Sequence, residues 1–95
     1  MSTLDQIAGK IIKEQELVIG PLAWTEAEKV QGLHVVNETS GEVMLNNGDP
    51  KETVNKLVWQ YERLFGRASH EVCREAAAVL VRSLAQADIP SSLSA

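Results

Sequence analysis

Two side chains that could do chemistry together stand about one helical turn apart, at His70 and Cys73. A histidine beside a cysteine can act as base and nucleophile, or the two can bind a metal ion. The chain has one other histidine, His34, and no second cysteine. A zinc site would therefore need carboxylates from elsewhere, and the sequence shows no orienting acid or oxyanion site. Since Cys73 falls among apolar residues, where a free cysteine packs as a small hydrophobe, we expect no catalytic activity, metal or cofactor.

Residues 61–80 have a helix, glycine, helix pattern, which is how a helix-turn-helix DNA-binding protein is built. In that alternative Arg67 and Arg74 contact DNA. Glu62 stands where the motif usually carries a small residue, and Glu75 stands where an apolar contact is expected. The net charge of -4, with 9 Lys and Arg against 13 Asp and Glu, also argues against a nucleic-acid partner. A plain helical hairpin is the favoured interpretation.

Trp59 falls on an otherwise polar face of its predicted helix, near Glu62 and Arg63. A tryptophan in such surroundings is typical of an interface anchor. The alternative is that the N-terminal helix or the hairpin folds over it. Val81 lies in the wide apolar sector of the last helix, so we name Trp59, Glu62, Arg63 and Val81 as candidate interaction residues. The leading hypothesis is a protein-interaction module without catalytic activity that binds another protein or itself, as a homodimer.

A second hypothesis is a small-molecule-binding regulatory domain. Its pocket would lie between the predicted hairpin and the helices, near Trp24 and His34. Trp24 is also expected to be a buried or half-buried anchor, whose indole N–H then needs a hydrogen-bond partner.

The first half of the chain predicts two helices and a hairpin. Apolar residues recur at helical spacing over residues 3–19, and Gly20 and Pro21 end that helix. A short helix follows within residues 21–32, starting at Pro21 or at a capping box formed by Thr25 and Glu28. Residues 33–37 and 42–46 are rich in β-branched and apolar types around a turn cluster, which predicts a β-hairpin.

The second half predicts two more helices. Asp49 caps a helix that begins at Pro50 and runs to about Phe65, and Gly66 ends it. The last helix covers residues 69–88, with Ser69 at its start and Pro90 as its stop. Its apolar residues fill a sector of about 200°, wider than the stripe of an ordinary surface helix. We therefore expect this helix to pack on two sides.

Together these elements predict an α+β fold of four helices with a central β-hairpin, in the order α-α-β-β-α-α, whose last two helices form an antiparallel hairpin. An all-α fold with an irregular segment in place of the hairpin is the alternative. We expect one domain over residues 1–90 and a flexible tail over 91–95. One cysteine allows no internal disulfide, and no apolar run reaches the length of a membrane span or forms a secretory signal. A cytoplasmic protein that does not bind membranes is expected.

Overall fold

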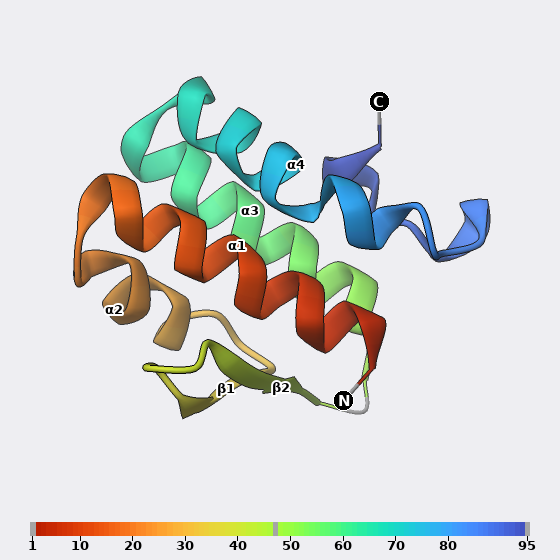
Figure 1. Ribbon diagram of the computed structural model, residues 1–95, viewed down its shortest axis with the longest axis horizontal. Helices are drawn as coiled ribbons and strands as arrows, with labels where there is room; N and C mark the ends of the chain where they lie inside the picture. The colour runs from red at the N-terminus through yellow and green to blue at the C-terminus, as the bar shows by residue number, and fades with distance from the viewer. Residues whose placement is uncertain (1, 47, 95) are drawn as a thin grey trace.

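The computed structural model describes residues 2–46 and 48–94 and contains helices and one hairpin in the predicted order (Figure 1). The α+β prediction is confirmed, and the hairpin rules out the all-α alternative. The elements are α1 (Thr3–Ile19), α2 (Leu22–Glu28), β1 (Leu33–Asn37), β2 (Glu42–Leu45), α3 (Pro50–Phe65) and α4 (Arg67–Val81), followed by the 3-10 helices η1 (Gln86–Asp88) and η2 (Ser91–Leu93).

Helix α1 begins with a capping box formed by Ser2 and Asp5, and Asp5 also contacts the hairpin. The Ser2 hydroxyl accepts from the Asp5 amide at 3.1 Å, and Asp5 Oδ2 accepts from the Ser2 amide at 3.3 Å. These bonds satisfy amide groups that the first helical turn leaves free. The other carboxylate oxygen of Asp5, Oδ1, accepts from the Leu45 amide of β2 at 3.1 Å. Asp5 therefore caps α1 and also connects this helix to strand β2 of the hairpin.

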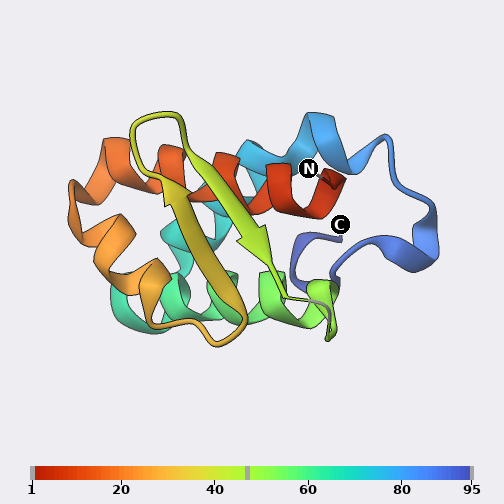
Figure 2. The same ribbon diagram turned by 90° about the horizontal axis from the view of Figure 1, so that it is seen from below.

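The hairpin pairs β1 and β2 antiparallel, with Leu33 opposite Leu45 and Val35 opposite Val43. Because side chains alternate along a strand, these four share a face, and Leu33 and Val43 are buried. Figure 2 shows the hairpin lying against α1 and α2.

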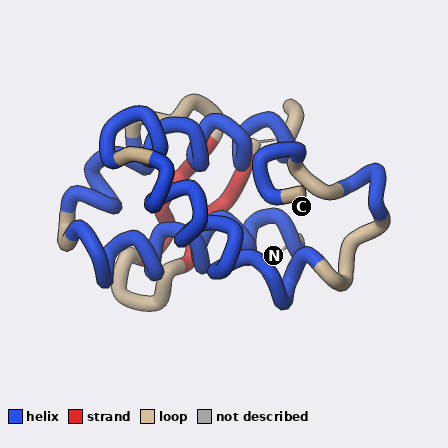
Figure 3. Tube along the Cα trace, turned by 90° about the horizontal axis from the view of Figure 1, so that it is seen from above, coloured by secondary structure: helices blue, strands red, loops and turns tan. Residues whose placement is uncertain are grey.

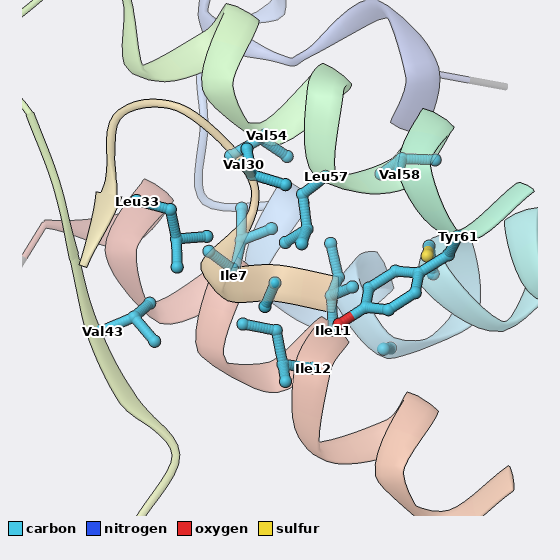
Figure 4. Close-up of a cluster of buried hydrophobic side chains, with 14 of the residues drawn as sticks. Ile7, Ile11, Ile12, Val30, Leu33, Val43, Val54, Leu57, Val58 and Tyr61 are labelled. Atoms are coloured by element: carbon cyan, nitrogen blue, oxygen red, sulfur yellow. The ribbon is translucent and has the colours of Figure 1, made fainter. Parts of the chain in front are cut away.

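The core lies where α1 is enclosed by the other elements. Figure 4 shows the α1 side chains of Ile7, Ile11 and Ile12 gathered with Val43 of the hairpin and Leu57 of α3, and these five side chains are fully buried. Burial of each such side chain is worth about 1.5–3 kcal/mol. The Tyr61 side chain crosses this core, and its hydroxyl donates to the carbonyl oxygen of Ala23 in α2 at 2.6 Å.

Helix α4 differs from its prediction at both ends. It begins at Arg67, directly after Gly66, whose φ of 92° turns the chain between the two helices in a single residue. It ends at Val81 instead of Asp88. The Ser83 amide donates to the Leu80 carbonyl at 3.1 Å and the Ser83 hydroxyl donates to the same oxygen at 2.7 Å. A serine hydroxyl that takes a backbone carbonyl competes with helix continuation.

The chain after α4 returns to the helices, whereas the sequence predicts a flexible tail over residues 91–95. Figure 3 shows this turn back toward the helices. Pro90 is fully buried and Leu93 is 6% exposed. The Ser92 amide and hydroxyl both donate to Asn55 Oδ1 of α3, at 2.9 and 2.6 Å. Residues 91–94 are therefore docked on α3 and α4, because the early end of α4 frees enough chain to reach back; Ala95 lies outside the described residues.

No helix in residues 2–46 or 48–94 has both the length and the apolar character needed to cross a membrane.

Candidate functional site

His70 and Cys73 do not form a reactive pair. His70 Nδ1 lies 3.1 Å from Glu62 Oε1 and Nε2 lies 2.6 Å from the Ser92 carbonyl oxygen, so both ring nitrogens are engaged with acceptors. The Cys73 sulfur is fully buried and accepts from Gln15 Nε2 at 3.3 Å. Burial raises the pKa of the Cys73 thiol to about 11, which keeps it in the unreactive protonated form at neutral pH. Across the described residues, no three His, Cys, Asp or Glu side chains are grouped to hold a metal ion.

Gln15 is a buried polar residue that the sequence interpretation did not single out. Its amide nitrogen donates to the Ser69 carbonyl at 2.8 Å and to Cys73, so it joins α1 to α4. Its carbonyl oxygen has no protein partner, and the same holds for the indole nitrogen of Trp24. The available signal was its spacing from Ile11 and Ile12, which places a polar residue on the apolar face of α1.

Trp24 and His34 do not line a common pocket. Trp24 is 2% exposed and belongs to the core. His34 lies between Leu33 and Val35 in β1, so its side chain points to the outer face of the hairpin, where Nε2 lies 2.8 Å from Asn46 Oδ1. The small-molecule hypothesis therefore loses the pocket on which it was based.

The structure brings together two of the four residues named as interaction residues. Trp59 and Arg63 lie on one exposed face of α3. Glu62 points instead toward α4, where it contacts His70. Val81 lines a different depression, formed by α4 and the C-terminal segment.

Trp59 is 45% exposed and lies in a surface depression of about 360 Å³ between α3 and the end of α2. We call this the Trp59 depression. Its lining carries side chains of cationic, amide and apolar types and no carboxylate: Lys29, Val30, Gln31, Lys56, Trp59, Gln60 and Arg63.

A larger apolar depression of about 740 Å³ runs between α1 and α4, and we call it the α1–α4 groove. Its lining includes Leu17 and Val79, which are 80% and 72% exposed and are the most exposed large apolar side chains among the described residues. The complete lining is Lys10, Glu14, Leu17, Val18, Val72, Glu75, Ala76, Val79 and Leu80.

The groove explains the wide apolar sector of α4. Helix α4 contacts both α1 and α3, as its sector predicts, through the buried residues Cys73, Ala76 and Ala77. Val79 is left outside both contacts. Val18 fits the apolar stripe of α1 in the sequence but is exposed and lines the groove with Val72 and Ala76 of α4. Helical spacing alone does not reveal how much of an apolar stripe a neighbouring helix covers.

One arginine of the DNA-binding alternative has an ion-pair partner, and the turn between α3 and α4 differs from that of a helix-turn-helix protein. Arg74 is paired with Glu71 on its own helix at 3.1 Å. A helix-turn-helix turn has about three to four residues, whereas Gly66 alone connects α3 and α4.

Comparison with known proteins gives no relative: no family model matches the chain, and neither the curated proteins nor the solved structures contain a match. Function is therefore inferred from the Trp59 depression and the α1–α4 groove.

Proposed function

We propose that this protein is an interaction module without catalytic activity that self-associates as a homodimer through the α1–α4 groove. The observation that carries this proposal is that the two most exposed large apolar side chains, Leu17 and Val79, line the same groove. Removing apolar surface of this kind from water lowers the free energy, so it favours association with a partner.

The charges around the groove favour a second copy as the partner. The rim carries both signs, with Lys10 and Glu14 on α1 and Glu75 on α4. A two-fold axis brings the same surface of each copy together, so a self-complementary rim is what a symmetric dimer requires. The Lys10–Glu14 pair is long, at 3.8 Å, and exposed. Such a pair contributes little in the monomer, which leaves Lys10 free to contact Glu75 of a second copy.

The absence of catalysis in this proposal is supported by the environment of the two candidate reactive groups. The Cys73 thiol is buried, with a pKa raised to about 11, and both ring nitrogens of His70 contact acceptors within the fold.

Light scattering over a wide range of protein concentration tests the proposal. The wild-type chain should have twice the monomer mass, and Leu17→Glu and Val79→Glu should each shift the protein to monomer, because they bury a charge in the interface. Val36→Glu is the matched control, since Val36 is an exposed apolar residue on the hairpin, away from the groove. A monomeric wild-type protein, or dimers that survive both groove substitutions, would contradict it.

A further inference from the structure

The Trp59 depression is positively charged, although the protein as a whole carries a net negative charge. Its lining includes three of the nine cationic residues, Lys29, Lys56 and Arg63, and no acid. The other surface depressions described for residues 2–46 and 48–94 each contain at least one carboxylate in their lining. In a chain of net charge -4, a hollow whose charged lining residues are all cations attracts anionic groups.

A hydrogen-bonded network holds two of the three cations of this depression, Lys29 and Arg63. Lys29 Nζ contacts Glu26 Oε2 at 3.0 Å, and Gln60 Nε2 donates to Glu26 Oε1 at 2.8 Å. The side-chain oxygen of Gln60, Oε1, then accepts from the Arg63 guanidinium at 2.9 Å. Glu26 is 8% exposed, and the hydrogen bonds from Lys29 and Gln60 lower its pKa. The carboxylate therefore stays charged and holds the network in place.

This network matters for binding because a ligand need not order the side chains itself. Immobilising a long side chain costs about 0.5–1.5 kcal/mol per residue on association, and Arg63 and Lys29 already have fixed partners. Glu26 offsets one of the positive charges. Lys56 has no ion pair with any described residue, so the depression keeps a net positive charge.

Trp59 adds an apolar surface between these cations. Lys56 and Arg63 lie three residues before and four residues after it, so the three side chains share one face of α3. Tryptophan and arginine are the residue types most often responsible for binding energy at protein interfaces. A ligand that fits this arrangement carries carboxylates next to an apolar or aromatic group.

We infer that the Trp59 depression binds an acidic peptide segment of a partner protein, with carboxylates on Lys56 and Arg63 and an apolar side chain on the indole of Trp59. The amide side chains of Gln31 and Gln60 line the same depression and offer the donors and acceptors that a peptide backbone needs. This site lies outside the α1–α4 groove, so the inference goes beyond self-association.

The surroundings favour a peptide over a single-stranded nucleic acid. A nucleic acid has a phosphate at every nucleotide and is bound along an extended cationic groove. Here the cations are confined to one depression. Glu28 precedes Lys29 in the chain and Glu52 lies one turn before Lys56, so acids interrupt the positive surface.

Titration with a blocked six-residue peptide of alternating glutamate and phenylalanine tests the inference. Tryptophan fluorescence and the NMR signal of the Trp59 indole N–H should both change and saturate. Arg63→Glu and Lys56→Glu should each weaken binding at least about tenfold, since each replaces attraction by repulsion. Added salt should also weaken it, because these charges are exposed to solvent. Both variants are surface changes whose fold is checked by circular dichroism.

Three controls can overturn the inference. Arg82→Glu makes the same charge change on an exposed residue outside the depression and should leave the affinity within about twofold; an equal loss there would reduce the effect to net charge. A peptide with glutamine in place of glutamate should not bind, and equal binding would exclude recognition of carboxylates. Tighter binding of an oligothymidylate than of the acidic peptide would assign the depression to nucleic acid. The dimer mass is measured separately, so failure here leaves the groove proposal standing.

Discussion

Gly9 of α1 lies against the carbonyl oxygen of Gly41 in the hairpin turn so closely that a Cβ atom on Gly9 would overlap that oxygen. The turn residue Gly41 has a φ of 78°, in the region that favours glycine. A Cβ on Gly41 would in turn meet the Lys13 side chain, with Cγ at 2.6 Å. Two glycines thus allow helix and hairpin to meet backbone to backbone, and Lys13 Nζ closes the contact with a hydrogen bond of 3.2 Å to the Thr39 carbonyl.

Gly9→Ala should destabilise the protein. At an unobstructed helical position the change would add about 1 kcal/mol to stability, but overpacking costs about 1–3 kcal/mol, and here the obstacle is backbone that cannot rotate away. We expect a net loss of up to about 2 kcal/mol, measured by urea unfolding at fixed protein concentration. Gly48→Ala is the control, because nothing lies within 4 Å of its Cβ position. A gain in stability from Gly9→Ala would show that the hairpin turn can move away from α1.

Asp5→Ala should cost more than Ser2→Ala. Ser2→Ala removes one capping bond, worth about 1 kcal/mol. Asp5→Ala also leaves the Leu45 amide without its acceptor, which adds about 1–3 kcal/mol if the group stays out of water. Amide hydrogen exchange at Leu45 should rise in the Asp5 variant and stay low in the Ser2 variant. Equal losses in the two variants would mean that the bond to β2 contributes nothing.

Asn55→Ala should release the C-terminal segment. Asn55 Oδ1 is the acceptor of both the Ser92 amide and the Ser92 hydroxyl, and two unsatisfied donors cost about 2 kcal/mol or more unless the segment opens to water. We expect faster proteolysis after residue 85 and a lower unfolding free energy. Ser94→Ala is the control, since its exposed hydroxyl contacts only the Ser91 carbonyl. Unchanged proteolysis in Asn55→Ala would show that apolar burial of Leu93 alone holds the segment.

The buried thiol predicts a loss of stability at alkaline pH. The pKa of Cys73 rises from 9.0 to about 11 on folding, so between these values the unfolded chain has lost the proton that the folded chain keeps. Stability from this group is present below pH 9 and decreases as the pH rises toward 11, by about 3 kcal/mol in total.

Cys73→Ser gives the matched comparison for this pH dependence, because a serine hydroxyl does not ionise in this range. The slope of unfolding free energy against pH between 8.5 and 10 should be shallower in the variant than in the wild type. Burial also raises the pKa of the Tyr61 hydroxyl, but that group is present in both proteins. Identical slopes would show that the thiol titrates alike in the folded and the unfolded chain.

Local patterns were enough to predict the order of elements. The capping aspartate before Pro50, the glycines at the helix ends and the alternation in residues 33–46 are all determined within a few residues of chain. The end of α4 was predicted seven residues too late, because apolar spacing continues past Val81 to Leu84. The helix ends where the Ser83 hydroxyl donates to the Leu80 carbonyl and the chain turns back to place Pro90 and Leu93 in the core, a contact that depends on residues of α3.

The surface features were predicted only in part. The helical wheel placed Trp59 and Arg63 on one polar face, and the structure puts both in one depression. The same wheel could not include Lys29 or Gln31, since they come from the end of α2, roughly 30 residues earlier in the chain. Glu62 was assigned to that face as well, but its contact with His70 depends on where α4 crosses α3. The periodicity of one helix does not show which elements distant in sequence contact it.

The hydrogen bonds from Gln15 to Ser69 and Cys73 affect how the nascent chain can fold during synthesis. A protein is synthesised from its N-terminus, so α1 is made before the helix that covers its Gln15 side. Until residues 67–81 emerge, Ile7, Ile11 and Ile12 have only part of their final cover. The apolar face of α1 therefore stays partly uncovered while residues 20–81 are synthesised.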